Sequence, residues 1–185
     1  MINLDPSDQY VKHLSNQCVS TWTSNQSVTL RFDRVHSLSL VPTTPFTLET
    51  FEFITKHFPH IRTLEVIQPV TQIISYMNDD LLSNLTLQLP SITKFCFLSS
   101  SHSDDYFVFR RFLYLLPSLI SLQMYIGRNL FREILSDNNQ SIRQALNRIQ
   151  LLQMVHFYDE KSVLTNEEIH SLFPNARILF SHDEF

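Results

Sequence analysis

The chain has 185 residues and a hydrophobic content of 43%, which is typical of one soluble globular domain. Its formal net charge of −4 gives no broad electrostatic reason to expect nucleic acid or an anionic membrane as a partner. No apolar stretch approaches the ~18 residues that a membrane-spanning helix needs. A single glycine, Gly127, excludes the Walker loop, the dinucleotide fingerprint and the G-x-S-x-G elbow, because these motifs need glycines at several fixed positions.

Residues 1–32 do not share the pattern of the rest of the chain. Asp5 and Pro6 predict the start of a helix over "PSDQYVKHL", residues 6–14. The stretches "CVSTW" and "SVTLRF" are candidates for a pair of strands. Because the first unit of a repeat array exposes a hydrophobic end, we interpret residues 1–32 as an N-terminal capping segment, followed by a repeat domain over residues 33–185.

From residue 33 onward, one apolar frame recurs six times. Four copies are built around a proline, as in "FPHIRTLEV", and two have Asp33 or Asn147 at the position of the proline. If this residue is frame position 0, the apolar residues fall at −1, +2, +5 and +7. The copies start at residues 33, 59, 90, 117, 147 and 174, in steps of 26 to 31 residues. A period of this size is typical of solenoids, propellers and other repeat arrays.

Each copy is predicted to supply one short strand. Positions +5 and +7 point to the same side of a strand, because side chains alternate along it. Helix starts fall between the strands: Thr165 with Glu168 matches a capping box, and Phe46 is placed to pack on Phe51. We expect helices to begin near Thr47, Asn78, Ser103, Ser141 and Thr165. Strands that alternate with helices are predicted to be parallel, so the expected fold class is α/β.

The strand pattern resembles a known repeat family. V-x-x-L-x-L at Val35, Leu38 and Leu40 resembles the L-x-x-L-x-L core of leucine-rich repeats. A period near 28 residues with a full helix resembles the ribonuclease-inhibitor and F-box-associated branches. This resemblance covers residues 33–185 and implies a short right-handed solenoid of about six strand–helix repeats with a parallel sheet. One departure is position +10, where the family usually has Asn or Cys; here it holds Thr43, Pro69, Ser100, Gly127, Phe157 and Glu184.

The resemblance implies a non-catalytic protein–protein interaction module, such as the substrate-recognition part of an F-box-type protein. In such a coil, side chains at +4, +6 and +8 line the concave face, and an apolar row there indicates a binding surface for another protein. The predicted protein-binding strip comprises Tyr125, Leu151, Gln153, Ile178, Phe180 and His182. The alternative is that other segments cover these residues, or that the strand register is shifted by one residue.

Two other hypotheses fit parts of the pattern. A small enzyme on a doubly wound α/β sheet also alternates strands with helices. However, strands of such a sheet are buried on both faces, whereas positions +4 and +6 are mostly polar through Gln123. The third hypothesis is self-association through the C-terminal end, because no helix follows the last predicted strand before Phe185. We predict no catalytic residues, no cofactor and no metal, and neither nucleic acid nor a membrane as a partner.

Histidines are the strongest candidates for a metal or acid–base site. His57 and His60 are spaced like some metal ligands, but the proline between them interrupts a helix, so two solvated turn histidines are the favoured interpretation. "VHFYDE" and "SHDEF" place His156 and His182 beside carboxylates at corresponding ends of two neighbouring repeats. A solvated loop edge is the favoured interpretation there as well.

The remaining candidates are cysteines and arginines. Cys18 and Cys96 are the two cysteines, too few for a disulfide framework or a cysteine zinc site, and we expect small buried side chains. The first residues lack a secretory signal, so a cytoplasmic or nuclear location is expected.

Four arginines are candidates for a small basic spot, but no wider basic stripe supports nucleic-acid binding there. It would be formed by Arg110, Arg111, Arg128 and Arg132.

Overall fold

The chain folds into one parallel sheet with helices packed against it. The computed structural model describes residues 10–15, 31–41, 46–67, 87–98, 105–125, 128–156 and 165–182. The strands are β1 (Tyr10–Ser15), β2 (Ser37–Val41), β3 (Thr63–Ile67), β4 (Lys94–Leu98), β5 (Ser121–Tyr125), β6 (Leu151–His156) and β7 (Arg177–His182). The helices are α2 (Leu48–His57), α4 (Asp105–Leu115), α5 (Arg128–Ser136), α6 (Gln140–Asn147) and α7 (Asn166–Leu172). The fold class is therefore α/β, as predicted.

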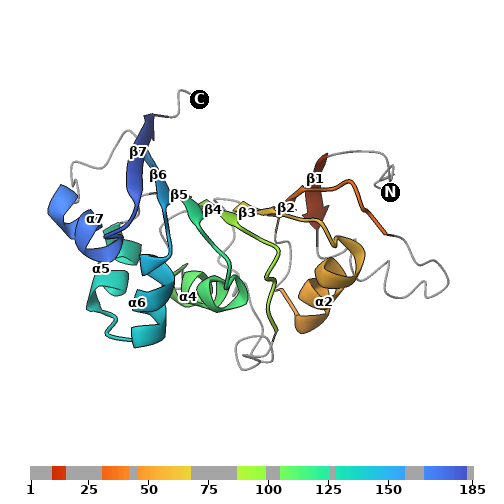
Figure 1. Cartoon of the computed structure of the whole chain (residues 1–185), viewed down its shortest axis with the longest axis horizontal. Coiled ribbons are helices and arrows are strands. Elements are labelled where there is room, and N and C mark those ends of the chain that lie inside the picture. The colour runs from red at the N-terminus through yellow and green to blue at the C-terminus, as the bar shows by residue number, and fades with distance from the viewer. Residues whose placement is uncertain are drawn as a thin grey trace.

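The strands lie side by side in chain order. The sheet runs from β1 to β7, and every neighbouring pair is parallel. Figure 1 shows the five described helices on one side of this sheet. A doubly wound sheet has helices on both faces and a point at which the strand order reverses. The described strands and helices show neither feature, so the doubly wound architecture is wrong for this part of the chain.

All six copies of the sequence frame form the same turn. In each, the backbone N–H at +2 donates to the carbonyl at −1, over 3.1 to 3.3 Å. The donor and acceptor pairs are Val35–Phe32, Ile61–Phe58, Ile92–Leu89, Leu119–Leu116, Ile149–Leu146 and Ala176–Phe173. The repeat seen in the sequence is therefore also a structural repeat.

Neighbouring turns are joined through the backbone at position +3. The carbonyl of His36 accepts the N–H groups of both Arg62 and Thr63, at 2.8 and 3.0 Å. The +3 carbonyls of the next three copies each accept two N–H groups in the same way, at 2.8 to 3.2 Å; these are Arg62, Thr93 and Ile120. Such bonds satisfy backbone groups that a turn would otherwise leave without partners.

The core lies between the sheet and the helices. In the first five copies, the side chains at −1, +2, +5 and +7 are all at most 3% exposed. The +5 row is continuous across the sheet, since Leu64, Phe95, Leu122 and Leu152 are paired on successive strands. Burial of one such side chain stabilises the fold by about 1.5–3 kcal/mol. The apolar rows therefore determine the strand register, as predicted.

The last strand departs from the frame by one residue. β6 and β7 pair as Leu151–Arg177, Leu152–Ile178, Gln153–Leu179, Met154–Phe180 and Val155–Ser181. Ile178 packs against the core, whereas Leu179 is 38% exposed. The prediction that Leu179 faces the core while Ile178 and Phe180 face away is therefore wrong. The observed register places Ile178 and Phe180 in the helix-side rows, where Ile178 packs against the core and Phe180 remains exposed, whereas the predicted one would place Ser181 beside Met154.

Two helix starts agree with their predicted caps. Thr47 is the N-cap of α2 in a capping box, and Phe46 contacts Phe51 with ring centroids 5.7 Å apart. In α7, the Thr165 N–H donates to the Glu168 carboxylate at 2.8 Å, and the Glu168 N–H donates to the Thr165 hydroxyl at 3.2 Å. Each box satisfies N–H groups at the helix start that have no partner within the helix.

Two predictions of local structure are wrong, and one helix was not predicted. α6 begins after Asn139 rather than after Ser141, because the Asn139 side chain accepts the Ser141 N–H at 2.9 Å. α5 was not predicted; it places Phe131 in the core. Residues 10–15 form β1, parallel to β2, instead of the helix expected over residues 6–14. This strand gives the edge of β2 a hydrogen-bonded neighbour.

Several predictions fall outside the described residues. These are the helix start at Asn78, the cap at Ser103, most of the two strands expected after Cys18, and all six residues at position +10.

Candidate interaction surface on the outer face of the sheet

Two rows of side chains cross the outer face of the sheet, opposite the helices, from β2 to β7. The first row is Ser37, Thr63, Lys94, Ser121, Leu151 and Arg177. The second row is Ser39, Glu65, Cys96, Gln123, Gln153 and Leu179. Because side chains alternate along a strand, these rows point away from the buried +5 and +7 rows.

Over β2 to β5, the outer face is polar and partly closed by contacts between neighbouring strands. The Ser39 hydroxyl donates to the Glu65 carboxylate on the next strand. Ser39 and Cys96 are both buried, and Lys94 is exposed. The burial expected for Cys96 is confirmed, whereas Cys18 lies outside the described residues. This part of the face offers hydrogen-bonding groups but little apolar area.

Over β6 and β7, the surface carries large apolar side chains beside the exposed Arg177. Leu151 is half-buried on the outer face, and Leu179 is 38% exposed beside Gln153. Phe180 belongs to the helix-side row of β7 but is 47% exposed. Among the described residues no strand follows β7 in the sheet. We call Leu151, Gln153, Leu179 and Phe180 the β6–β7 patch. Exposed apolar side chains grouped on neighbouring strands are a mark of interaction sites.

The structure retains part of the predicted strip and changes the rest. Leu151 and Gln153 lie on the outer face as expected, and Leu179 joins them because of the register shift. Ile178 lies on the helix side and packs against the core. Tyr125 and His182 lie in β5 and β7, where they pair with Val155 and His156; their side chains are outside the description. A second frame shifted by one residue in the last copy would have identified Leu179.

The candidate metal-binding histidines do not form a site. His57, at the end of α2, is buried and stacks on Phe53 with ring centroids 4.3 Å apart. His60 is exposed, and its carbonyl accepts a hydrogen bond from His36 Nδ1 at 3.1 Å. The interpretation as solvated turn histidines is thus right for His60 and wrong for His57. Within the described ranges there is no group of three or more His, Cys, Asp or Glu side chains that could hold a metal ion.

Two further histidines are neighbours in the sheet. His156 and His182 are paired positions of β6 and β7, so the expectation that these two strand ends approach each other is confirmed for the backbone. The carboxylates that follow them in the sequence lie outside the described residues.

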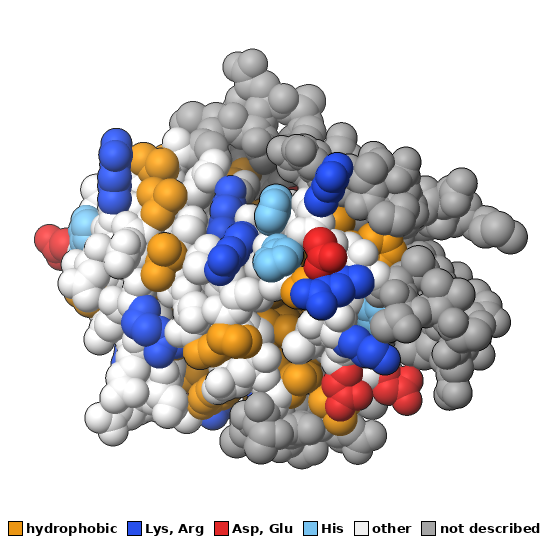
Figure 2. Space-filling model, turned by 45° about the vertical axis from the view of Figure 1, so that its right-hand side comes forward, with side chains coloured by type: hydrophobic (Ala, Val, Ile, Leu, Met, Phe, Trp, Pro, Cys, Tyr) orange, Lys and Arg blue, Asp and Glu red, His pale blue; other side chains and the backbone are white. Residues whose placement is uncertain are grey.

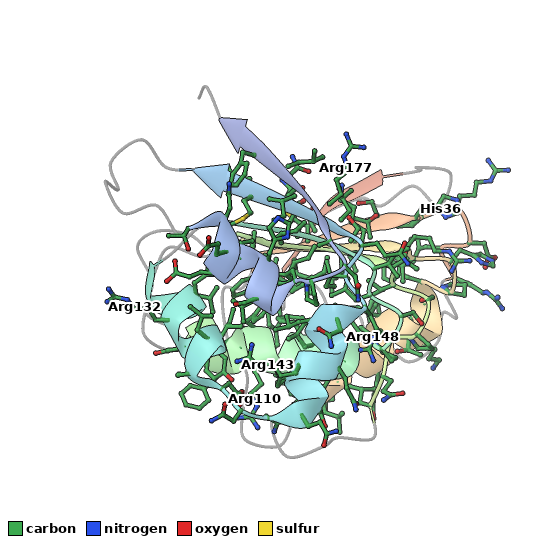
Figure 3. All side chains as sticks on the ribbon, turned by 60° about the vertical axis from the view of Figure 1, so that its left-hand side comes forward. His36, Arg110, Arg132, Arg143, Arg148 and Arg177 are labelled. Carbon is green, nitrogen blue, oxygen red and sulfur yellow. The ribbon has the colours of Figure 1, made fainter. Side chains whose placement is uncertain are left out.

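The four arginines proposed as a basic spot have different environments. Arg111 is only 3% exposed, and burial lowers the pKa of its guanidinium, while interaction with Tyr114 raises it in part. Arg110 is half-buried in α4, and Arg132 is exposed on α5 (Figure 3). The Arg128 side chain is outside the description. A buried Arg111 cannot contribute charge to a shared surface, so a spot of four arginines is wrong.

None of the helices described is long and apolar enough to cross a membrane. No protein-family model, no curated protein and no solved structure matches the chain.

Proposed function

We propose that the chain is a non-catalytic protein–protein interaction module, built as a short leucine-rich-repeat-like solenoid. One observation carries this proposal: six copies of one frame make the same turn, and their strands stack in chain order with the described helices on one side. Repeat proteins with this kind of arrangement use the sheet face as an extended binding surface. The repeat period near 28 residues and the full helices support membership in the F-box-associated branch of leucine-rich repeats. In that role the chain is the substrate-recognition part of a larger protein, in the cytoplasm or nucleus.

The β6–β7 patch is the proposed contact surface. Its apolar members, Leu151, Leu179 and Phe180, lie on the last two strands, and Gln153 lies between them. Interfaces concentrate their binding energy in a few apolar or aromatic side chains surrounded by polar groups. The polar outer face of β2 to β5 provides such surroundings on one side of the patch.

The test compares two single substitutions of the same type. Leu179→Asp places a charge in the patch. Phe107→Asp is the matched control, because Phe107 is 61% exposed on α4, on the helix side of the sheet. Both substitutions replace an exposed apolar residue, so circular dichroism is expected to show that both variants fold.

Immobilised chains are used to capture proteins from cell extracts, and recovery is quantified by mass spectrometry. We expect Leu179→Asp to reduce recovery of specific partners by about tenfold, because a buried unpaired charge opposes association. The Phe107→Asp variant is expected to recover them as the natural chain does. Equal recovery by all three chains, or equal loss in both variants, contradicts a binding role for the patch.

A further inference from the structure

A second surface lies at the edge of the sheet where the strands begin. It is formed by frame positions 0 to +4 and is called here the N-terminal edge. Seven basic side chains lie along it, and all are exposed: Arg34, His36, His60, Arg62, Lys94, Arg148 and Arg177. Figure 3 shows His36, Arg148 and Arg177 on the same side of the molecule and Arg132 on the opposite side. Figure 2 shows Lys, Arg and His side chains across one face, with a few Asp or Glu side chains toward one end of it.

The charge on this edge is opposite in sign to that of the whole chain. Across the six copies, positions 0 to +4 hold five Lys or Arg residues and one acidic residue, Asp33, whereas the chain has a net charge of −4. Asp33 forms a salt bridge with Arg31 at 2.7 Å, the one salt bridge among the described residues. The edge cations therefore have no carboxylate partner in the described structure, and their field attracts an anionic partner.

The basic row is interrupted at β5 by an apolar pocket. The pocket has a volume of about 340 Å³, and its lining combines Pro117, Leu119 and Ile120 with polar residues, Arg148 among them. Ile120 is 42% exposed and occupies position +3, which holds a basic residue in three other copies. Opposite it, Asn175 Nδ2 donates to the Asn147 carbonyl at 2.8 Å and holds two neighbouring turns together. The edge thus combines charge at both ends with an apolar recess between them.

The spacing of the strands gives the length of a matching partner. Neighbouring strands are about 4.8 Å apart, so the edge from β2 to β7 is about 24 Å long. An extended peptide spans about 3.3 Å per residue, so about eight residues cover the edge. The pocket lies two strands from β7 and three from β2. A partner that fits has acidic residues at both ends and one apolar side chain roughly three residues from one end.

A protein segment fits this edge better than a nucleic acid does. Single-stranded nucleic acids are bound by stacking of bases on aromatic side chains, together with a basic groove. Positions 0 to +4 hold no Phe, Tyr or Trp in any of the six copies. An aliphatic side chain fills the apolar part of the pocket and buries Ile120.

We propose that the N-terminal edge binds an extended acidic segment of another protein. Carboxylates of that segment pair with Arg34, Arg62, Lys94, Arg148 and Arg177, and one apolar side chain enters the pocket beside Ile120. This surface borders the β6–β7 patch at Leu151, which is position +4 of its copy and is paired with Arg177. The side chains altered in the two tests are nevertheless different, Arg62 and Arg148 here and Leu179 there. The inference therefore goes beyond the proposed function, and either surface can fail its test while the other passes.

The test is a fluorescence anisotropy titration of the full chain with labelled peptides. The probe is Glu-Glu-Ser-Leu-Ser-Glu-Glu-Glu. The peptide of reversed sequence is tested as well, because an extended segment can lie along the edge in either of two directions. A peptide with Gln in place of every Glu has the same length and apolar side chain but no side-chain charge. We expect at least one acidic peptide to bind about tenfold more tightly than the Gln peptide, and the difference to shrink as salt screens the charges.

Variants of the chain locate the binding site. Arg62→Glu and Arg148→Glu are each expected to weaken binding of the acidic peptide by about tenfold. The matched control is Arg132→Glu, an exposed arginine on the opposite side, which is expected to leave binding unchanged. All three positions are exposed, and circular dichroism checks that each variant folds.

Three results overturn the proposal. The first is that neither acidic peptide binds more tightly than the Gln peptide. The second is that Arg132→Glu weakens binding as much as the edge variants do. The third is that a single-stranded oligonucleotide of matched charge binds more tightly than both acidic peptides, which would assign the edge to nucleic acid instead.

Discussion

Phe95 of β4 is paired with Leu122 of β5, and both side chains are completely buried. Phe95 also contacts Phe112 of α4, with ring centroids 4.7 Å apart. This pair links two neighbouring strands to the helix beneath them, so it belongs to the part of the core that holds adjacent copies of the repeat together.

Removing the Leu122 side chain is expected to destabilise the whole sheet. Leu122→Ala leaves a cavity beside Phe95, and substitutions of this kind reduce the free energy of unfolding by about 2–5 kcal/mol. The control is Ser121→Ala, at the neighbouring half-buried position on the outer face, for which a change within about 0.5 kcal/mol is expected. Urea unfolding followed by circular dichroism measures both. Equal effects of the two substitutions would contradict the assignment of the buried row.

The register of β7 predicts that two neighbouring residues contribute unequally to the stability of the fold. Ile178 packs against the core and Leu179 is exposed, so Ile178→Ala is expected to lower the free energy of unfolding more than Leu179→Ala does. The difference should be about 1 kcal/mol, since Ile178 is only partly buried. Urea unfolding of the two variants side by side provides the measurement. A larger loss for Leu179→Ala would favour the unshifted sequence frame.

The start of α7 depends on a reciprocal pair of hydrogen bonds between Thr165 and Glu168. Thr165→Ala removes the side-chain acceptor and is expected to cost about 1 kcal/mol of stability. Thr165→Ser keeps the hydroxyl and should retain most of that stability. Thermal unfolding of both variants tests the pair; indistinguishable melting temperatures for Ala and Ser would show that the cap does not stabilise the fold.

The sequence predicted the turns and five strands closely, because their positions are controlled by complete burial. Each apolar residue at −1, +2, +5 and +7 in these copies is enclosed by neighbours of the same kind, and a shift of one residue would expose all of them. In the last copy this constraint is weaker, since Ile178, Leu179 and Phe180 are apolar in succession. The turn hydrogen bond from Ala176 to Phe173 is kept, but the strand after it begins one residue early.

Other features left a weaker signal in the sequence. β1 has no copy of the frame before it, and α5 adds a second helix to a copy in which one was expected. The N-terminal edge was not predicted because four of its five Lys and Arg residues are at positions +1 and +3, in turns and at strand starts. The predicted binding surface comprised only the outward strand positions +4, +6 and +8. Arg34 with His36 and His60 with Arg62 repeat in phase, and this repetition is the signal that could have identified the edge.

The two-donor carbonyls at position +3 have a consequence for how this chain can diversify. Main-chain hydrogen bonds at this position join each of the first five units to the next. Among the described residues, side-chain bonds from the same position add to this connection at His36, which bonds the His60 carbonyl, and at Arg62, which donates to the Ser91 carbonyl. His36, Arg62, Thr93, Ile120 and Gln150 occupy equivalent sites with quite different chemistry. Because the main-chain bonds are the same whichever residue is present, the side chain at position +3 can change in one unit, and with it the ligand preference of that unit, while the backbone scaffold stays the same.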